Sequence, residues 1–162
     1  MATENYDASL AHLKKSATGL RFGLVVSQWN SDITSSMCQA AQTTLMQAGA
    51  NQEDIITQQV PGSFELIYGC SRMMEHRNDL DAIIAIGSVI RGETAHFDHV
   101  CSATAQGIAR LNERASIPVL FCVLTDENKE QAIDRSGGRL GNKGTEAAAA
   151  AVEMAWLRKD LS

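Results

Sequence analysis

One segment in the middle of the chain contains the residue types that proton transfer and phosphate binding require. His96 carries an imidazole, a group well suited to proton transfer near neutral pH. Gly92 and Thr94 precede it, and with the exposed amides of a helix start they form a candidate anion cradle. A nucleotide P-loop is excluded, because Glu93 stands where that loop needs its lysine. His96 and His99 could instead bind a metal ion, although no further cluster of ligating residues lies nearby.

A second segment, residues 135–144, is basic and rich in glycine, with three cations and four glycines in ten residues. Arg135 and Lys143 could bind an anionic group there. The same composition is typical of a flexible turn between two helices. The sequence therefore offers a second candidate anion site together with a structural alternative to it.

Polar and aromatic residues follow two short apolar runs nearer the N-terminus. Trp29 stands in a polar break, where an indole ring either caps the edge of a sheet or stacks on a planar ligand. Asn30 suits a turn or an N-cap. Ser63 suits the N-cap of a helix and Glu65 suits its first turn. These structural roles do not explain why backbone amides and a carboxylate gather at one place, so a binding site remains an alternative.

The elements that must position these residues are strands that alternate with helices. Short apolar runs rich in β-branched residues alternate four times with segments of helical spacing. This pattern predicts βαβ units with right-handed crossovers, and hence an α/β protein built as a three-layer α/β/α sandwich on a four-stranded parallel sheet. The expected strands are Phe22–Val26, Ile55–Val60, Asp81–Gly87 and Ile117–Leu124, and the expected helices are 33–48, 64–74, 96–114, 128–135 and 145–159, with a glycine-rich break at 137–144. Ligands bind beyond the carboxyl ends of such strands, so the segments 27–31, 61–65, 87–97 and 125–128 are the candidate site.

The composition indicates one globular domain and favours chemistry on small molecules. The chain has 162 residues, of which 44% are apolar, and a chain of this size buries a core without a disulfide or a metal. Residues 1–20 are expected to be an N-terminal extension and residues 21–162 a single domain. No apolar run reaches the roughly 20 residues of a membrane span, and no secretory signal is recognisable. A formal net charge of −5 argues against nucleic-acid binding. Without a recognisable span or signal we expect a cytoplasmic protein. The four widely spaced cysteines are expected to be reduced.

Five motifs follow one another in a characteristic order between Phe22 and Leu157. They are W-N after the first strand, P-G-S-F-E after the second, G-S-V-I-R-G-E-T-A-H-F after the third, F-C-V-L-T in the fourth, and R-S-G-G-x-x-G-N-K-G-x-E-A-A before the last helix. In these motifs and their order the chain resembles the 6,7-dimethyl-8-ribityllumazine synthase family. The G-E-T-A-H-F and G-N-K-G segments are the specific ones. Trp29 stands where many members have phenylalanine, and its larger ring would keep the stacking role and allow the site to hold flavins as well as lumazine. Cys122 stands where many members have glycine and does not touch the implied chemistry.

The resemblance implies a flavodoxin-like fold and a transferase of riboflavin biosynthesis. The implied reaction condenses 5-amino-6-(D-ribitylamino)uracil with 3,4-dihydroxy-2-butanone 4-phosphate and releases phosphate and water. In such enzymes the pyrimidine's amine attacks the ketone to form an imine, phosphate is eliminated, and the ribitylamino nitrogen closes the ring. No enzyme lysine or redox cofactor is required, which agrees with the lack of a dinucleotide-binding fingerprint in this sequence. Most of the catalysis would come from holding two reactants together.

The resemblance also gives each matching residue a role. It implies that His96 is the general acid and base near the leaving phosphate, and that Arg135 clamps this phosphate. The backbone amides of Gly92, Glu93 and Thr94 would face the same anion, with the Glu93 side chain pointing away. The residues expected to bind the pyrimidine and its ribityl chain are Trp29, which stacks on the ring, Asn30, Gly62, Ser63, Glu65, Ser88, Val89 and Ile90, together with Phe121 and Lys143 of a neighbouring subunit.

A homo-oligomer is the implied assembly. Members of the family form pentamers, and many stack pentamers into a hollow 60-subunit shell. The short loop between Arg135 and Lys143 resembles that of shell-forming members, so we expect at least a pentamer and a 60-subunit shell, with riboflavin synthase as a candidate partner. Two other functions remain open: a flavin-binding module on the same fold, and a riboflavin synthase of the archaeal type.

Overall fold

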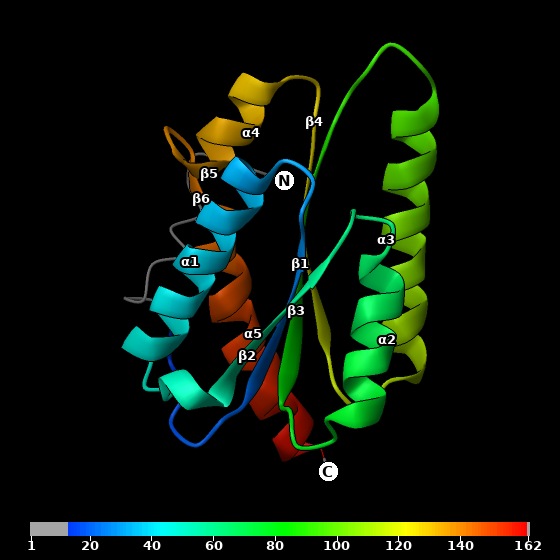
Figure 1. Cartoon of the computed structure of the whole chain (residues 1–162). Coiled ribbons are helices and arrows are strands. Elements are labelled where there is room, and N and C mark those ends of the chain that lie inside the picture. Colours follow the sequence, from blue (N-terminus) through cyan, green and yellow to red (C-terminus); the bar gives the residue numbers. More distant parts are fainter. Residues whose placement is uncertain (1–12, 162) are drawn as a thin grey trace.

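The computed structural model describes residues 13–161, which form one main sheet, a small hairpin and helices on both sides of the sheet (Figure 1). The strands are β1 (Phe22–Ser27), β2 (Ile55–Val60), β3 (Ala82–Ile90), β4 (Val119–Asp126), β5 (Ser136–Gly138) and β6 (Gly141–Asn142). The helices are α1 (Ser31–Gln47), the 3-10 helix η2 (Gln52–Asp54), α2 (Leu66–His76), α3 (His96–Arg114), α4 (Lys129–Arg135) and α5 (Lys143–Asp160). None of the helices within this range is long and apolar enough to cross a membrane.

The main sheet is parallel, with the strand order β2-β1-β3-β4. Phe22 of β1 pairs with Ile55 of β2 on one side and with Ala82 of β3 on the other, and Ile83 of β3 pairs with Val119 of β4. Helices α1, α4 and α5 cover one face, while α2 and α3 cover the other (Figure 1). The predicted three-layer α/β sandwich with a four-stranded parallel, flavodoxin-like sheet is therefore confirmed.

Two apolar clusters hold the three layers together. Leu24 and Ile84 point to the face packed against α1 and α5, whereas their neighbours Val25 and Ile83 point to the face packed against α2 and α3. Successive side chains of a strand point to opposite faces. Because helices cover both faces, the central strands are apolar at nearly every position, and this produced the short uniform runs seen in the sequence.

Strands β3 and β4 extend further at their carboxyl ends than the sequence predicts. The expected ends were Gly87 and Leu124, whereas the strands end at Ile90 and Asp126. Residues 88–90 continue the parallel register with the end of β4, so the backbone pairing carries on beyond the glycine. Three residues expected in a loop therefore belong to a strand, which fixes their backbone more firmly than a loop would.

The glycine-rich segment before α5 forms an antiparallel hairpin where only a break was expected. Ser136 pairs with Asn142 and Gly138 with Gly141. Gly137 and Gly141 have φ angles of 118° and 79°, a backbone region that glycine adopts without steric cost. The Asn142 side chain then accepts a hydrogen bond from the first turn of α5. The hairpin thus gives the chain a defined path between α4 and α5.

Helix α5 lies directly against α1. A Cβ atom added to Gly144 would stand 1.9 Å from the carbonyl oxygen of Met37 and 3.0 Å from its Cα. Further along α5, Ala148 and Ala151 are completely buried. The small residues at the start of α5 therefore allow its backbone to touch that of α1, which explains the alanine-rich sequence better than helix propensity alone.

The described part of the N-terminal segment packs against the end of α5. The Trp156 Nε1–H donates to the Ser16 carbonyl oxygen at 2.7 Å, and Ala17 and Leu20 belong to the buried core. Residues 1–12 of the expected extension lie outside the described residues. The following eight residues thus contribute apolar contacts to the domain.

Candidate active site

The loops after β1 and β2 lie side by side at the carboxyl edge of the sheet. The Gln28 N–H donates to the Val60 carbonyl oxygen at 2.9 Å, and the Trp29 N–H donates to that of Pro61 at 3.2 Å. These two bonds join the β1–α1 and β2–α2 loops into one rim. We call the rim and the polar groups beneath it the crevice; its members among the expected site residues are Trp29, Asn30, Gly62, Ser63, Glu65 and Ser88.

Trp29 lies on the rim with 72% of its surface exposed. A Cβ atom added to Gly62 would stand 3.5 Å from Cδ1 of this indole and 2.9 Å from the Glu65 carboxylate. Gly62 therefore keeps open a space between the ring and the carboxylate. A tryptophan that capped the sheet edge would be buried, whereas this ring is free to stack on a ligand.

Asn30 connects the β1–α1 loop to the end of β3. Its φ of 55° is left-handed, a conformation that asparagine tolerates better than most residues. The residue occupies the N-cap position of α1, but its side chain makes no capping bond. Instead, Nδ2–H donates to the Ser88 carbonyl oxygen at 3.1 Å. The side chain thus ties two strand ends together beneath the rim.

Three buried serine hydroxyls at this edge have no hydrogen-bond partner among residues 13–161. They belong to Ser27, Ser63 and Ser88. Gly87 permits a close approach here, since a Cβ atom on it would stand 2.7 Å from the Ser63 Oγ. Buried hydroxyls are normally hydrogen-bonded, so these groups are available to a polar ligand. Ser27 lies in the expected segment 27–31, but sequence reasoning assigned it no role; the signal was a polar residue at the end of a buried strand.

The start of α2 differs from the expected capping pattern. Ser63 was expected at the N-cap, but α2 begins at Leu66 and Glu65 occupies the N-cap position without a side-chain capping bond. The Ser63 carbonyl oxygen accepts a bond from the buried Thr104 hydroxyl at 3.4 Å. The structural explanation of Ser63 as a cap is therefore wrong, and its hydroxyl remains without a partner.

His96 begins α3 and its side chain is exposed. Its backbone N–H donates to the Thr94 Oγ1 at 3.4 Å, and Gly92 has open space around it, because a Cβ there would meet nothing within 4 Å. Residues 92–94 are all exposed. Across residues 13–161, no three His, Cys, Asp or Glu side chains are grouped as metal ligands would be. The loop therefore presents an imidazole and an accessible backbone side by side.

Arg91 is the cation nearest this loop in the sequence, but its charge is already compensated. Its guanidinium lies 2.7 Å from the Glu127 carboxylate and 3.0 Å from that of Asp98, and it stacks 4.1 Å from the centre of the Phe97 ring. These contacts hold the base of the β3–α3 loop. A phosphate bound at this loop would need its counter-charge from another cation.

A separate hollow of about 610 Å³ runs along the outer edge of β4, and it contains three of the expected site residues, Phe121, Arg135 and Lys143. We call it the edge hollow. The Arg135 Nη1 lies 3.6 Å from the Asp126 Oδ1 and donates to the Gln131 carbonyl oxygen at 3.3 Å. The guanidinium is therefore oriented by one carboxylate and one carbonyl group.

Lys143 is also held in the edge hollow. Its ammonium pairs with the Glu146 carboxylate one helical turn away, and its carbonyl oxygen accepts a bond from the Cys122 Sγ at 3.4 Å. Burial raises the pKa of Cys122 to about 12, so this thiol stays protonated and serves packing. Phe121, by contrast, is 45% exposed on the edge strand.

Within one chain, none of the crevice residues lines the edge hollow. The crevice lies at the ends of β1, β2 and β3, whereas the hollow lies on β4, the last strand of the sheet. Among residues 13–161, no hydrogen bond or ion pair joins Arg135 to residues 92–94. Arg135 thus groups with Phe121 and Lys143, the two residues that the sequence resemblance attributed to a neighbouring subunit.

Comparison with known proteins gives one consistent result. A family model described as 6,7-dimethyl-8-ribityllumazine synthase matches residues 19–159, which include the crevice and the edge hollow. The 6,7-dimethyl-8-ribityllumazine synthase of Christiangramia forsetii is 53% identical over 162 residues, covering 99% of this chain and 96% of that protein. Its namesake in Flavobacterium johnsoniae is 51% identical and covers 100% and 86%. In Bacteroides fragilis the protein of this name is 50% identical and covers 83% and 94%.

Proposed function

Because the chain belongs to the 6,7-dimethyl-8-ribityllumazine synthase family, we propose that it condenses 5-amino-6-(D-ribitylamino)uracil with 3,4-dihydroxy-2-butanone 4-phosphate. The products are 6,7-dimethyl-8-ribityllumazine, phosphate and water, and the reaction is the penultimate step of riboflavin biosynthesis. The crevice is the observation that carries this assignment to the chain: an exposed Trp29 ring stands beside buried, unpartnered hydroxyls of Ser63 and Ser88. A planar pyrimidine with a polyhydroxyl chain complements both.

The pyrimidine is placed in the crevice. Trp29 stacks on the ring, and the space that Gly62 leaves open admits it next to the Glu65 carboxylate, which accepts hydrogen bonds. The backbone of Val89 and Ile90, fixed by pairing with β4, borders the same end of the sheet. The remaining contacts to the ring and the ribityl chain are assigned to Asn30, Ser63 and Ser88.

The butanone phosphate is placed between the crevice and the start of α3. Its phosphate rests on the amides of residues 92–94 and the N-terminal end of this 19-residue helix, which favours an anion. Arg135 supplies the counter-charge that Arg91, already paired with two carboxylates, does not. His96 moves protons as the imine forms and the phosphate leaves.

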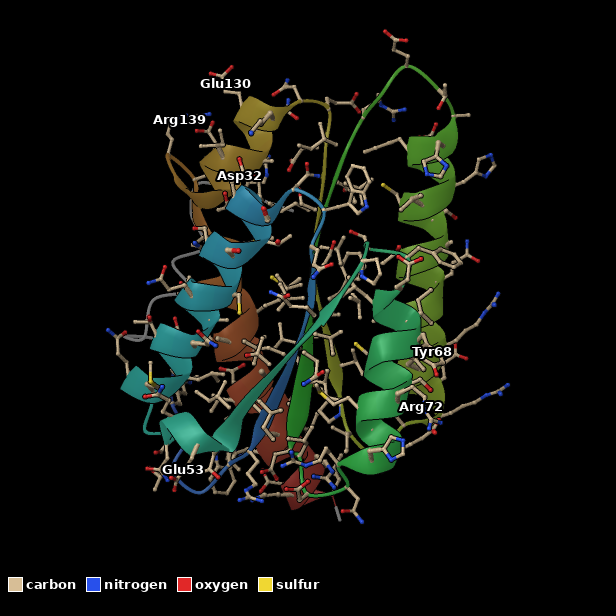
Figure 2. The ribbon with its side chains drawn as sticks, viewed as in Figure 1. Asp32, Glu53, Tyr68, Arg72, Glu130 and Arg139 are labelled. Carbon is tan, nitrogen blue, oxygen red and sulfur yellow. The ribbon has the colours of Figure 1, made fainter. Side chains whose placement is uncertain are left out.

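A second copy of the chain must bring Phe121, Arg135 and Lys143 to this site. The proposal is supported by the separation of the edge hollow from the crevice and by two exposed aromatic side chains on different surfaces, Phe121 in the edge hollow at 45% and Phe64 beside α2 at 53%. Phe64 lines a hollow of about 1010 Å³ between α2 and α3. Figure 2 shows Tyr68 and Arg72 on α2, the helix that forms one wall of this hollow.

The assembly we propose is a homopentamer, and further a 60-subunit shell with riboflavin synthase as a candidate partner, in the cytoplasm. Sedimentation velocity tests the first step, since a pentamer of this 17.5 kDa chain is clearly separated from a monomer. A stable monomer with full activity would contradict both the assembly and the shared site.

The proposed function is tested by mixing the two substrates with the purified protein and following the fluorescence of the lumazine. We expect a rate proportional to protein concentration and well above the uncatalysed background. A rate equal to background would favour the flavin-binding alternative if the protein also binds added flavin. Conversion of lumazine alone into riboflavin would favour a riboflavin synthase.

Substitution of His96 tests the role of proton transfer. We expect His96→Ala to lower kcat about 100-fold, at the low end of what general acid–base catalysis provides, because holding the reactants together supplies most of the acceleration. His99→Ala, which removes an exposed imidazole from the same helix, is the matched control. Steady-state kinetics at saturating substrates measure the effect, and equal kcat values for the two variants would exclude a role for His96.

A further inference from the structure

Asp126 is a buried carboxylate in the edge hollow that the reaction described above does not use. Its side chain is 7% exposed, its Oδ1 lies 3.6 Å from the Arg135 Nη1, and its Oδ2 has no hydrogen-bond partner among residues 13–161. It ends β4, and its carbonyl oxygen accepts the Arg91 N–H at 3.0 Å. The side chain thus faces the guanidinium with one oxygen unsatisfied, inside a hollow of about 610 Å³.

A phosphate that binds Arg135 must share this hollow with the Asp126 carboxylate. The two anions compete for the same guanidinium and repel each other, and burial strengthens both effects because solvent screens them less. The separation of 3.6 Å is longer than a charge-assisted hydrogen bond of about 2.8 Å, so the carboxylate holds the guanidinium loosely. Phosphate can displace this contact without breaking a well-formed hydrogen bond.

We propose that Asp126 is a positioning residue that holds Arg135 in the edge hollow and competes with bound phosphate, so that it weakens the affinity for the phosphate substrate and favours release of the phosphate product. The inference rests on the proposed function, because it requires that Arg135 binds the phosphate group. The negative charge of Asp126 thus reduces the electrostatic attraction between the Arg135 guanidinium and the bound phosphate.

The ionisation of Asp126 gives this competition a pH dependence. Burial raises the pKa of the Asp126 carboxyl group, and Arg135 opposes the rise only in part. Below this raised pKa the carboxyl is neutral and competition ends; above it the competing charge is present. The effect of Asp126 on the affinity for a bound anion must therefore be lost as the pH falls.

The elements around Asp126 carry other charged side chains, and most of these already form ion pairs with one another. On α4, Lys129 pairs with Asp32 and Asp134 with Arg139. On α5, Lys143 pairs with Glu146 in the same hollow. At the ends of β3 and β4, Arg91 pairs with Glu127. Arg135 is consequently the cation whose charge Asp126 modulates most directly.

Inorganic sulfate is the probe for this proposal, because it keeps two negative charges over the working pH range whereas phosphate titrates. Calorimetric titration of the assembled protein would compare wild type with Asp126→Asn, which keeps the shape and removes the charge. We expect Asp126→Asn to bind sulfate about tenfold more tightly near neutral pH, and to lower the KM of the butanone phosphate more than it changes kcat. The ratio of the two sulfate affinities should approach one as the pH falls, because groups other than Asp126 are the same in both proteins and cancel in this ratio.

Two further variants separate the possible failures. Glu130→Gln removes one negative charge from the exposed start of α4 (Figure 2), and we expect less than a twofold change, since solvent screens exposed charges. Arg135→Ala should abolish sulfate binding at this site. An Asp126→Asn affinity equal to or weaker than wild type, or an affinity ratio independent of pH, would overturn the proposal while leaving the function intact. Unchanged sulfate binding in Arg135→Ala would instead overturn the assignment of the phosphate site itself.

Discussion

We expect replacement of Arg135 by alanine to raise the KM of the butanone phosphate about 100-fold and to leave the KM of the pyrimidine nearly unchanged. Hydrogen bonds to charged groups contribute about 1.5–3 kcal/mol each, and every 1.4 kcal/mol is a factor of about ten in affinity. Arg91 cannot substitute, because Asp98 and Glu127 already compensate its charge. The measurement is steady-state kinetics with each substrate varied in turn, at a concentration where sedimentation shows the same assembly for both proteins.

Arg139→Ala is the control for this prediction. Arg139 is a guanidinium of the same segment, but it pairs with Asp134 at 2.9 Å and projects from the hairpin to the outer surface (Figure 2). Arg139→Ala removes the same charge from a residue that does not line the edge hollow. If Arg135→Ala raised both KM values equally, Arg135 would be supporting the assembly or the fold rather than holding phosphate.

The sequence predicts the layered fold and the region of the site for a clear physical reason. Trp29 and Ser63 each follow a buried strand, and the carboxyl ends of parallel strands meet at one edge. The structure brings them to one rim through bonds between neighbouring loops. Periodicity and topology thus suffice to gather residues that are more than thirty positions apart in the chain.

Other features depend on contacts that a pattern of residue types does not specify. Ser63 has the sequence signature of a helix cap, yet α2 begins three residues later. Asp126 was expected in a loop, but it pairs with Ile90 at the end of β4, and its carboxylate lies 3.6 Å from the Arg135 guanidinium. The hairpin needs the φ angles of two particular glycines in a segment that contains four. Each of these depends on tertiary hydrogen bonds rather than on local propensity.

Gly144→Ala should destabilise the protein by about 3 kcal/mol, because the added methyl group would overlap the backbone of α1 and the two helices would have to separate. The added Cβ atom would stand only 1.9 Å from the Met37 carbonyl oxygen. For a chain of this length such a loss lowers the midpoint of thermal unfolding by about 6–12 °C. Differential scanning calorimetry at one fixed protein concentration measures it, since the stability of an oligomer depends on concentration.

Gly92→Ala is the matched variant for stability. A Cβ at this position meets nothing within 4 Å, so we expect its unfolding temperature to stay close to that of the wild type. Because both variants replace glycine by alanine, the difference between them isolates the contact between α1 and α5. Equal unfolding temperatures would mean that α5 shifts away from α1 without loss of stability.

The separation of the crevice from the edge hollow has a genetic consequence. If neighbouring chains share each site, a subunit altered at Arg135 disables the crevice of its neighbour and keeps its own crevice intact, while a subunit altered at Trp29 does the reverse. Two inactive proteins mixed during assembly would then produce some sites in which both halves are intact. Such complementation between alleles is impossible for a site that one polypeptide completes by itself.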